Sequence, residues 1–233
     1  MSLNIQEELK NLNNEEYKTV LQRFFKTGKG QYGEGDVFLG LKSEPLTRTA
    51  KKYLSLGFNE LQELLEDEIH ECRSAALVIL KEQFKKGDER KRKEIFQFYL
   101  NNTRNINNWD LVDCSAPQIV GIHLLDQDRK ILYRLAKSKN LWEKRIAMIS
   151  TFSFIRNQEF EDTLKIAEIL LNDKHDLIHK AVGWMLRELG KRDQAVEEIF
   201  LKKYYNTMPR TMLRYSIERF EETKRQKYLK GLI

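Results

Sequence analysis

Glycine, proline and cysteine are scarce in this chain of 233 residues. Eleven glycines and three prolines are about half of what average usage would give. Because both residues interrupt helices, their scarcity favours a helical protein. The two cysteines, Cys72 and Cys114, do not form a CxxC pair, which excludes a zinc finger and a disulfide framework and favours a reducing compartment.

Long apolar runs are also missing. The longest uncharged stretch near the apolar segments, residues 114–125, has 12 residues, whereas a membrane-spanning helix needs ~20. Glutamates stand near the N-terminus, where a signal peptide would have an apolar run. We therefore expect a cytoplasmic protein that does not enter a membrane. We also expect a monomer.

Positive charge is in excess at one end of the chain. The formal net charge is +6, and residues 202–233 alone hold nine Lys or Arg against three Asp or Glu, so the remaining residues balance. A basic end favours a polyanionic partner, with nucleic acid as the first candidate. A solvated helix face that carries lysines for solubility explains the same charge equally well.

Apolar residues recur along the chain with the spacing of amphipathic helices, and no window alternates with a period of two over a useful length. Between these windows stand residues that suit helix starts, and we expect Asn59, Asp88 and Asn108 to be N-caps. We read residues 27–44, which are rich in glycine, as a loop. The sequence thus predicts an all-α protein of about a dozen helices.

The predicted helices repeat. Similar segments begin at Arg73, Trp109, Arg145, Lys180 and Arg210, which are 36, 36, 35 and 30 residues apart. That period fits one pair of helices with its turns, and stacked helix pairs form an α-solenoid with a concave inner face.

The repeat register predicts which side chains line that concave face, because residues four apart share one side of a helix. The residues so placed are Trp109 with Asp113, Lys180 with Trp184 and Arg187, and Arg210 with Arg214. Taken singly, a tryptophan there is more often part of the core and an aspartate more often solvated. The coincidence of cations, two indoles and one carboxylate at equivalent positions favours a site.

Two other motifs are poor matches to known sites. Residues 28–33 read GxGxxG, but a dinucleotide site needs a preceding strand, which this chain lacks. His175 and His179 have the spacing of zinc ligands, yet the glutamate of HExxH is missing and no third ligand suggests itself. We expect no metal site.

Several strings resemble the AlkD family of DNA alkylation-repair glycosylases, and the resemblance covers nearly the whole chain. It is carried by the segments 109–113 (WDLVD), 144–148 (KRIAM), 180–188 (KAVGWMLRE) and 38–40 (FLG) with Pro45 downstream. The resemblance implies an α-solenoid of HEAT-like helix pairs with a concave basic groove, as a single domain over residues 1–233. It also implies removal of positively charged alkylated purines, such as 3-methyladenine and 7-methylguanine, from double-stranded DNA without metal or cofactor.

The resemblance also assigns roles to residues. It implies that Asp113 is the catalytic carboxylate, that Trp109 and Trp184 are aromatic walls, and that Arg145 lies near the backbone at the lesion. The further residues that we expect to bind DNA are Arg187, Lys180, Lys144, Arg210 and Arg214.

Two other classes of function compete with the glycosylase. A non-catalytic helical-repeat scaffold would bind nucleic acid or protein through the same face and release no base. A repeat protein that reads single-stranded RNA would show similar side-chain triplets in each repeat, but the first residues of these repeats differ.

Overall fold

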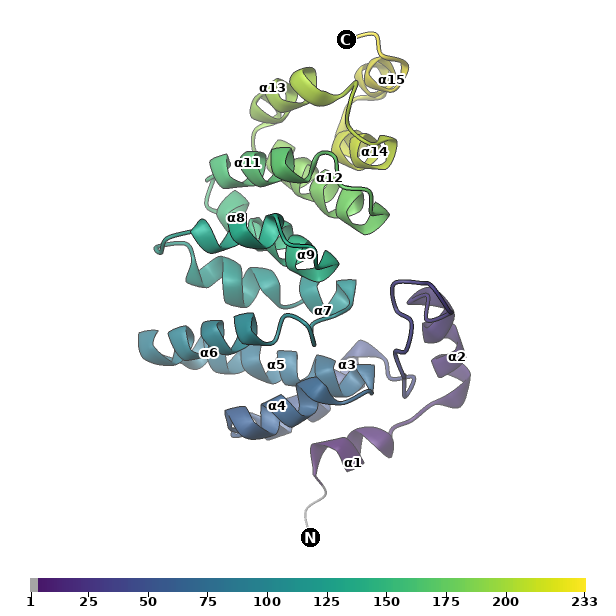
Figure 1. The fold of residues 1–233 in the computed structure, drawn as a ribbon, viewed down its shortest axis with the longest axis vertical. Helices are drawn as coiled ribbons and strands as arrows, with labels where there is room; N and C mark the ends of the chain where they lie inside the picture. The colour runs from purple at the N-terminus through teal and green to yellow at the C-terminus, as the bar shows by residue number, and fades with distance from the viewer. Residues whose placement is uncertain (1–3) are drawn as a thin grey trace. The chain divides into compact units, whose positions relative to one another are not determined.

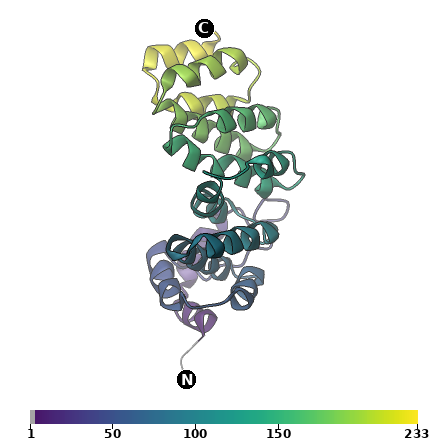
Figure 2. The ribbon, with the colours of Figure 1, turned by 90° about the vertical axis from the view of Figure 1, so that its left-hand side faces the viewer.

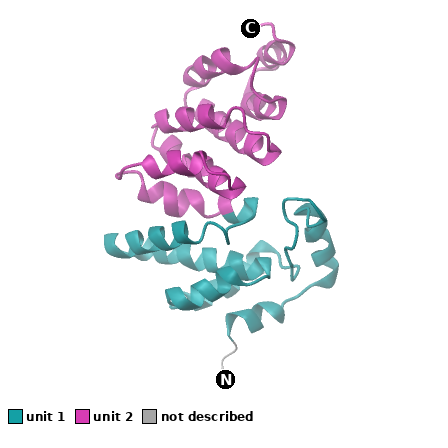
Figure 3. Ribbon diagram, in the orientation of Figure 1, with its two compact units in different colours: residues 1–111 teal, residues 112–233 magenta. Residues whose placement is uncertain are grey.

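The computed structural model describes residues 4–233, and within them the regular structure is helical (Figure 1). An isolated bridge between Val37 and Ile69 is the one extended pairing in this range. The all-α prediction is confirmed. The chain forms two compact units, of which the first ends at Leu111 and the second begins at Val112 (Figure 3).

The first unit is built around its longest helix, α5. Its helices are α1 (Ile5–Lys10), α2 (Glu15–Phe24), α3 (Ser43–Ala50), α4 (Phe58–Glu66), α5 (His70–Lys86) and α6 (Glu89–Asn101), followed by the start of α7 (Trp109–Asp113). α3, α4 and α6 pack against α5, which therefore buries Ala75, Ala76, Ile79 and Leu80 completely.

The segment between α2 and α3 is irregular, as predicted, although α3 begins at Ser43, just inside the expected loop. Its last part is held by Glu71, whose carboxylate accepts hydrogen bonds from three consecutive amides, those of residues 39–41, at 2.9, 2.9 and 3.1 Å. Gly40 has a φ of +83°, and a Cβ there would lie 2.2 Å from the carbonyl oxygen of Asn14. Only glycine permits this close approach.

The second unit consists of helices that lie in successive rows (Figure 2). They are α8 (Lys130–Ala136), α9 (Leu141–Ser150), α10 (Phe152–Arg156), α11 (Glu161–Leu170), α12 (Asp176–Gly190), α13 (Gln194–Tyr204), α14 (Arg210–Ser216) and α15 (Glu222–Lys230), with a π-helical turn at 117–121. α12 packs against α9, α11, α13 and α14 and forms the centre of the core. At Gly183 the approach of α14 is so close that a Cβ would lie 2.5 Å from that of Tyr215.

The predicted helix starts are confirmed in part. Asp88 is the N-cap of α6, and the Asn108 side chain accepts a hydrogen bond from the amide of Trp109 at 2.8 Å. The expectation for Asn59 is wrong, because Asn59 lies inside α4. The cap is Gly57, whose amide donates to Glu60 at 2.7 Å.

Helical structure alone does not establish a solenoid with a concave basic groove or a single repeat domain. Both expectations stay predictions. Among the helices of residues 4–233, none combines the length and the apolarity needed to cross a membrane.

Candidate functional site

In the second unit, Asp113 forms an ion pair with Arg145 of α9. The Arg145 guanidinium donates to both carboxylate oxygens, with Nε–Oδ1 at 2.8 Å and Nη2–Oδ2 at 2.7 Å. The two side chains are only 6% (Arg145) and 13% (Asp113) exposed. A planar bidentate pair of this kind fixes the orientation of the carboxylate, and a guanidinium partner favours its charged form.

Arg145 is in turn held by the main chain, since its Nη1 donates to the carbonyl oxygen of Leu177 at 2.5 Å. Arg145 is thus buried and bound through all three guanidinium nitrogens. The family resemblance implied that Arg145 lies near the DNA backbone. The structure gives it a different contact, that with Asp113, and the DNA contact stays a prediction.

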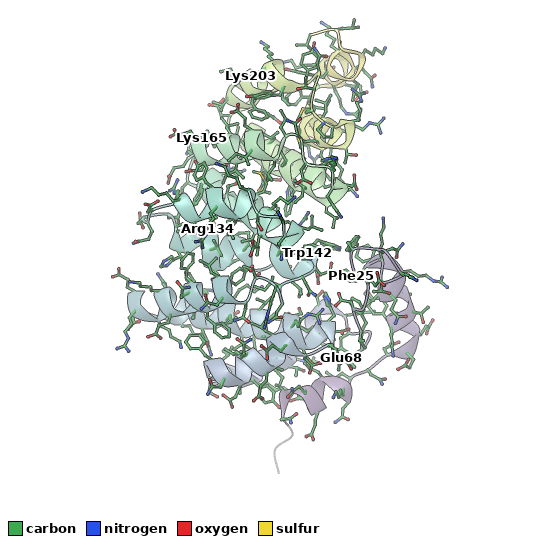
Figure 4. All side chains as sticks on the ribbon, viewed as in Figure 1. Phe25, Glu68, Arg134, Trp142, Lys165 and Lys203 are labelled. Carbon is green, nitrogen blue, oxygen red and sulfur yellow. The ribbon has the colours of Figure 1, made fainter. Side chains whose placement is uncertain are left out.

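Trp109, at the start of α7, belongs to an aromatic group in the first unit. Its ring stacks on Phe25 with centroids 5.2 Å apart and planes 23° apart, and it meets the edge of Phe24 at 5.6 Å. Phe25, labelled in Figure 4, is buried, whereas Phe24 is 59% exposed. Trp109 itself is partly exposed, so these aromatic neighbours do not enclose it completely.

Trp184 lies on α12 in the second unit and is also partly exposed. The ring centroid of Phe152 lies 6.2 Å from that of Trp184. The guanidinium of Arg156 lies over the ring of Phe152, 4.6 Å from its centroid. A tryptophan at either position could instead have belonged to the core. Neither Trp109 nor Trp184 is fully buried.

Three of the residues predicted to bind DNA form ion pairs within the second unit. Lys144 pairs with Asp173 at 2.5 Å and Lys180 with Asp176 at 2.7 Å, and Arg187 pairs with Glu218. Arg210 is exposed and donates to the carbonyl oxygen of Leu229 at 2.9 Å, and Arg214 is exposed on α14. A phosphate would have to share or replace these carboxylates, and DNA binding by these residues stays a prediction.

A second buried polar group lies in the first unit, and sequence analysis missed it. His70, at the start of α5, contacts Asp36 through Nδ1 at 3.2 Å and Asp110 through Nε2 at 2.8 Å. Asp36 also accepts from Asn108 at 2.9 Å and pairs with Arg73. We call these five residues the His70 cluster.

Burial by itself would disfavour a charged imidazole at this place. The charge and hydrogen bond of Asp110, together with those of Asp36, outweigh it and raise the pKa of His70 to about 9. The pKa of Asp36 is lowered, because its hydrogen bond to His70 and the charge of Arg73 outweigh the opposing effect of burial. At neutral pH the cluster therefore holds a buried imidazolium between two carboxylates.

A signal for this cluster was present in the sequence. His70, Glu71 and Arg73 stand at the start of α5, just before the apolar run of residues 75–80, and all three are buried. Buried charges need partners, so charged residues next to an apolar run indicate polar contacts, although no such contact is among the expectations drawn from the sequence. The identity of those partners was hidden, because Asp36 and Asp110 are 34 and 40 residues away.

The two histidines with zinc-like spacing serve the backbone instead. His175 caps α12 by accepting from the amide of Leu177 at 3.2 Å, and His179 contacts the carbonyl oxygen of Asp173 at 2.5 Å. Within residues 4–233, no group of three or more His, Cys, Asp or Glu side chains is arranged to hold a metal ion.

Comparison with known proteins identifies the class of protein. The sequence model of a family described as DNA alkylation repair enzyme matches residues 5–220, and the chain therefore belongs to that family. A solved structure described as a predicted DNA alkylation repair enzyme from Enterococcus faecalis has a similar fold, with a TM-score of 0.69 and 16% identity over 90% of this chain and 97% of that one. No curated protein sequence matches the chain.

Proposed function

We propose that this protein is a DNA glycosylase that excises positively charged alkylated purines, of the 3-methyladenine and 7-methylguanine type, from double-stranded DNA. The observation that carries the proposal is the ion pair of Asp113 with Arg145. A buried bidentate arginine holds a carboxylate charged and in one orientation, which is what electrostatic stabilisation of a cationic transition state requires.

The chemistry explains why a carboxylate is the central group. A purine alkylated at N3 or N7 already carries a positive charge, so it leaves as a neutral base and needs no general acid. As the N-glycosidic bond lengthens, positive charge moves onto the sugar. A fixed carboxylate beside C1′ stabilises this charge more than it stabilises the ground state, and that difference is catalysis. Asp113 would also orient the attacking water.

The two tryptophans would bind the cationic nucleotide. Trp109 and Trp184 are partly exposed, and each ring face attracts a cation with about 0.5 to 2 kcal/mol, depending on desolvation. Recognition through ring faces and backbone leaves the base unenclosed, so bulky adducts would also be substrates. Arg187, Lys180, Lys144, Arg210 and Arg214 would contact phosphates of DNA along the concave basic face of a HEAT-like solenoid.

The experiment is a base-release assay under single-turnover conditions with duplex DNA that contains 7-methylguanine. The wild-type protein is expected to release the free base. Asp113→Asn is expected to reduce the excision rate by roughly 10² or more, because it removes the negative charge, while DNA affinity stays within a few fold.

The matched control is Asp162→Asn, in the same unit. Asp162 also pairs with a half-buried arginine, Arg129, at 2.8 Å, and the two side chains are 16% and 17% exposed. This variant removes a carboxylate that accepts one hydrogen bond from Arg129 and one from the hydroxyl of Tyr133, at 2.8 and 2.5 Å, and it should retain excision. Equal loss in both variants would mean that Asp113 matters for folding alone. DNA binding without any release of base by the wild-type protein would support the non-catalytic scaffold instead.

A further inference from the structure

Two members of the His70 cluster, Asn108 and Asp110, flank Trp109 in the sequence. Asp110 follows Trp109 and contacts His70 directly at 2.8 Å. Asn108 precedes Trp109, accepts a hydrogen bond from its amide at 2.8 Å, and donates to Asp36, which contacts the other nitrogen of His70. The residues on each side of Trp109 are therefore linked by their side chains to the same imidazole, Asp110 directly and Asn108 through Asp36.

The ring of Trp109 is connected to the same place. Phe25 stacks on Trp109 and has its centroid 5.1 Å from that of His70. Phe38 stacks on Phe25 at 5.1 Å and on His70 at 4.5 Å. The four rings thus form one continuous packed group, with Trp109 at its partly exposed end.

Stability alone does not account for this arrangement. Replacing buried charges by apolar residues of similar volume is often neutral or stabilising, because desolvation opposes the attraction. His70 is 3% exposed, and Asn108 is fully buried. Both ring nitrogens of His70 have a carboxylate partner in these surroundings, and this favours one geometry, since another arrangement would leave the buried imidazolium unpaired.

We propose that His70 is a positioning residue for Trp109: it links the glycine-rich loop, through Asp36, to the first turn of α7, through Asp110, and so fixes the Trp109 ring. The consequence for excision rests on the proposed function, in which Trp109 meets the cationic nucleotide. The effect of His70 on the position of the Trp109 ring does not depend on that function.

The first test needs no enzymatic activity. The chain has three tryptophans, and the exchanges Trp142→Phe and Trp184→Phe leave Trp109 as the one fluorescent indole. In this background His70→Gln is expected to shift the Trp109 emission to longer wavelength and to increase its quenching by acrylamide, because the ring leaves its packed position. Asp162→Asn, which disrupts an ion pair in the second unit, is the control and should change neither signal.

His70→Gln is suited to this test because glutamine donates from one nitrogen only, whereas the two ring nitrogens of His70 contact two carboxylates on different segments. Should this variant fail to fold by circular dichroism, Asp110→Asn replaces it. The Asp110 side chain is 24% exposed, and the substitution removes the link next to Trp109 with little change of shape. A folded variant of either kind with unchanged emission and quenching would overturn the proposal.

The second test asks whether His70 acts through Trp109. A misplacement of about 1 Å can cost up to 10² in rate, so we expect His70→Gln to lower single-turnover excision by roughly tenfold or more. In a Trp109→Ala background the same exchange should cost nothing further, because the residue that it positions is gone. Losses that multiply in the double variant would overturn the proposal. If the wild-type protein excises no base, the proposed function fails, and the fluorescence test still decides the role of His70.

Discussion

In the first unit the carboxylates of Asp36, which is 6% exposed and also pairs with Arg73, and of Asp110, which is 24% exposed, both contact His70, a base that can lose its proton. In the second unit Asp113 is held by Arg145, whose guanidinium keeps its charge. The difference follows from geometry as well as chemistry. An imidazole donates in two opposite directions and can join two segments, while a guanidinium presents a planar fork to one carboxylate. The first unit thus contains a pH-sensitive link between segments, and the second contains a permanent orientation of one group.

The largest expected effect comes from breaking the pair in the second unit. Arg145→Met keeps much of the side-chain volume but leaves the Asp113 carboxylate and the Leu177 carbonyl oxygen without the guanidinium. Removing one partner of a buried pair costs about 3 to 5 kcal/mol. At about 2 to 4 °C for each kcal/mol in a chain of this size, the melting temperature should fall by about 10 °C.

Calorimetry on the wild-type protein and the variant measures this loss. Arg145→Lys is the matched control, because it keeps the charge but cannot form the planar bidentate contact, and its melting temperature should lie between the other two. A melting temperature of Arg145→Met close to the wild-type value would show that the pair contributes orientation without stability.

The link in the first unit should reveal itself through pH. The folded pKa of His70, about 9, lies above its ordinary value of 6.5, so the folded state holds the proton more tightly than the unfolded state. The resulting stabilisation is fully present below about pH 6.5 and is lost as the pH rises through 9, a change of a few kcal/mol. The charged groups around this imidazole are Asp36 and Asp110, with Arg73 beyond Asp36.

The measurement is the midpoint of urea unfolding at several pH values between 6 and 10. Lysines, tyrosines and cysteines also titrate at the alkaline end, so the informative quantity is the wild-type stability minus that of His70→Gln. This difference should be largest at pH 6 and shrink toward pH 10. A difference that stays constant over the range would mean that His70 is not charged in the folded protein.

Local sequence patterns predicted the helices better than the contacts between them. Periodic apolar residues indicated the helices on both sides of Asp88, and the asparagine or aspartate next to a helix start has a local cause, the unpaired amides of the first turn. The prediction failed at Asn59, where Glu60 reaches back to the amide of Gly57 and thus moves the start of the helix.

In the candidate site, too, the sequence identified residues but not the contacts between them. Asp113 and Arg145 each stand in a string that resembles a known family, yet their ion pair joins residues 32 apart and has no local signature. For His70, partners in the loop and at α7 come together through tertiary packing alone. Sequence patterns identified charged residues in unusual places, and the three-dimensional fold was needed to show which of them are partners.

A second pair of buried residues extends the comparison between the units. Glu71 in the first unit is 2% exposed and accepts hydrogen bonds from three backbone amides. Glu197 in the second unit is 1% exposed, and among the described residues its Oε1 has no hydrogen-bond partner. Burial, reinforced by the charge of Glu198, raises the pKa of Glu197 to about 9. One glutamate is thus stabilised by donors, while the other is neutral at physiological pH.

The smallest effect is expected for Glu197→Gln at about pH 5, where a neutral amide replaces a neutral acid of the same shape and stability should change by less than ~1 kcal/mol. Glu71→Gln, the comparison variant, loses charge-assisted hydrogen bonds and places an NH₂ group against amide donors, which should cost about 2 kcal/mol or more.

The pH dependence of stability distinguishes the two glutamates further. Because the folded pKa of Glu197, about 9, exceeds the ordinary 4.5, its proton is lost on unfolding, and wild-type stability should fall as the pH rises between these values. Urea unfolding at pH 5 and pH 8 should therefore show Glu197→Gln gaining on the wild-type protein, and a loss relative to wild type at pH 8 would show that Glu197 is charged and paired in the folded state.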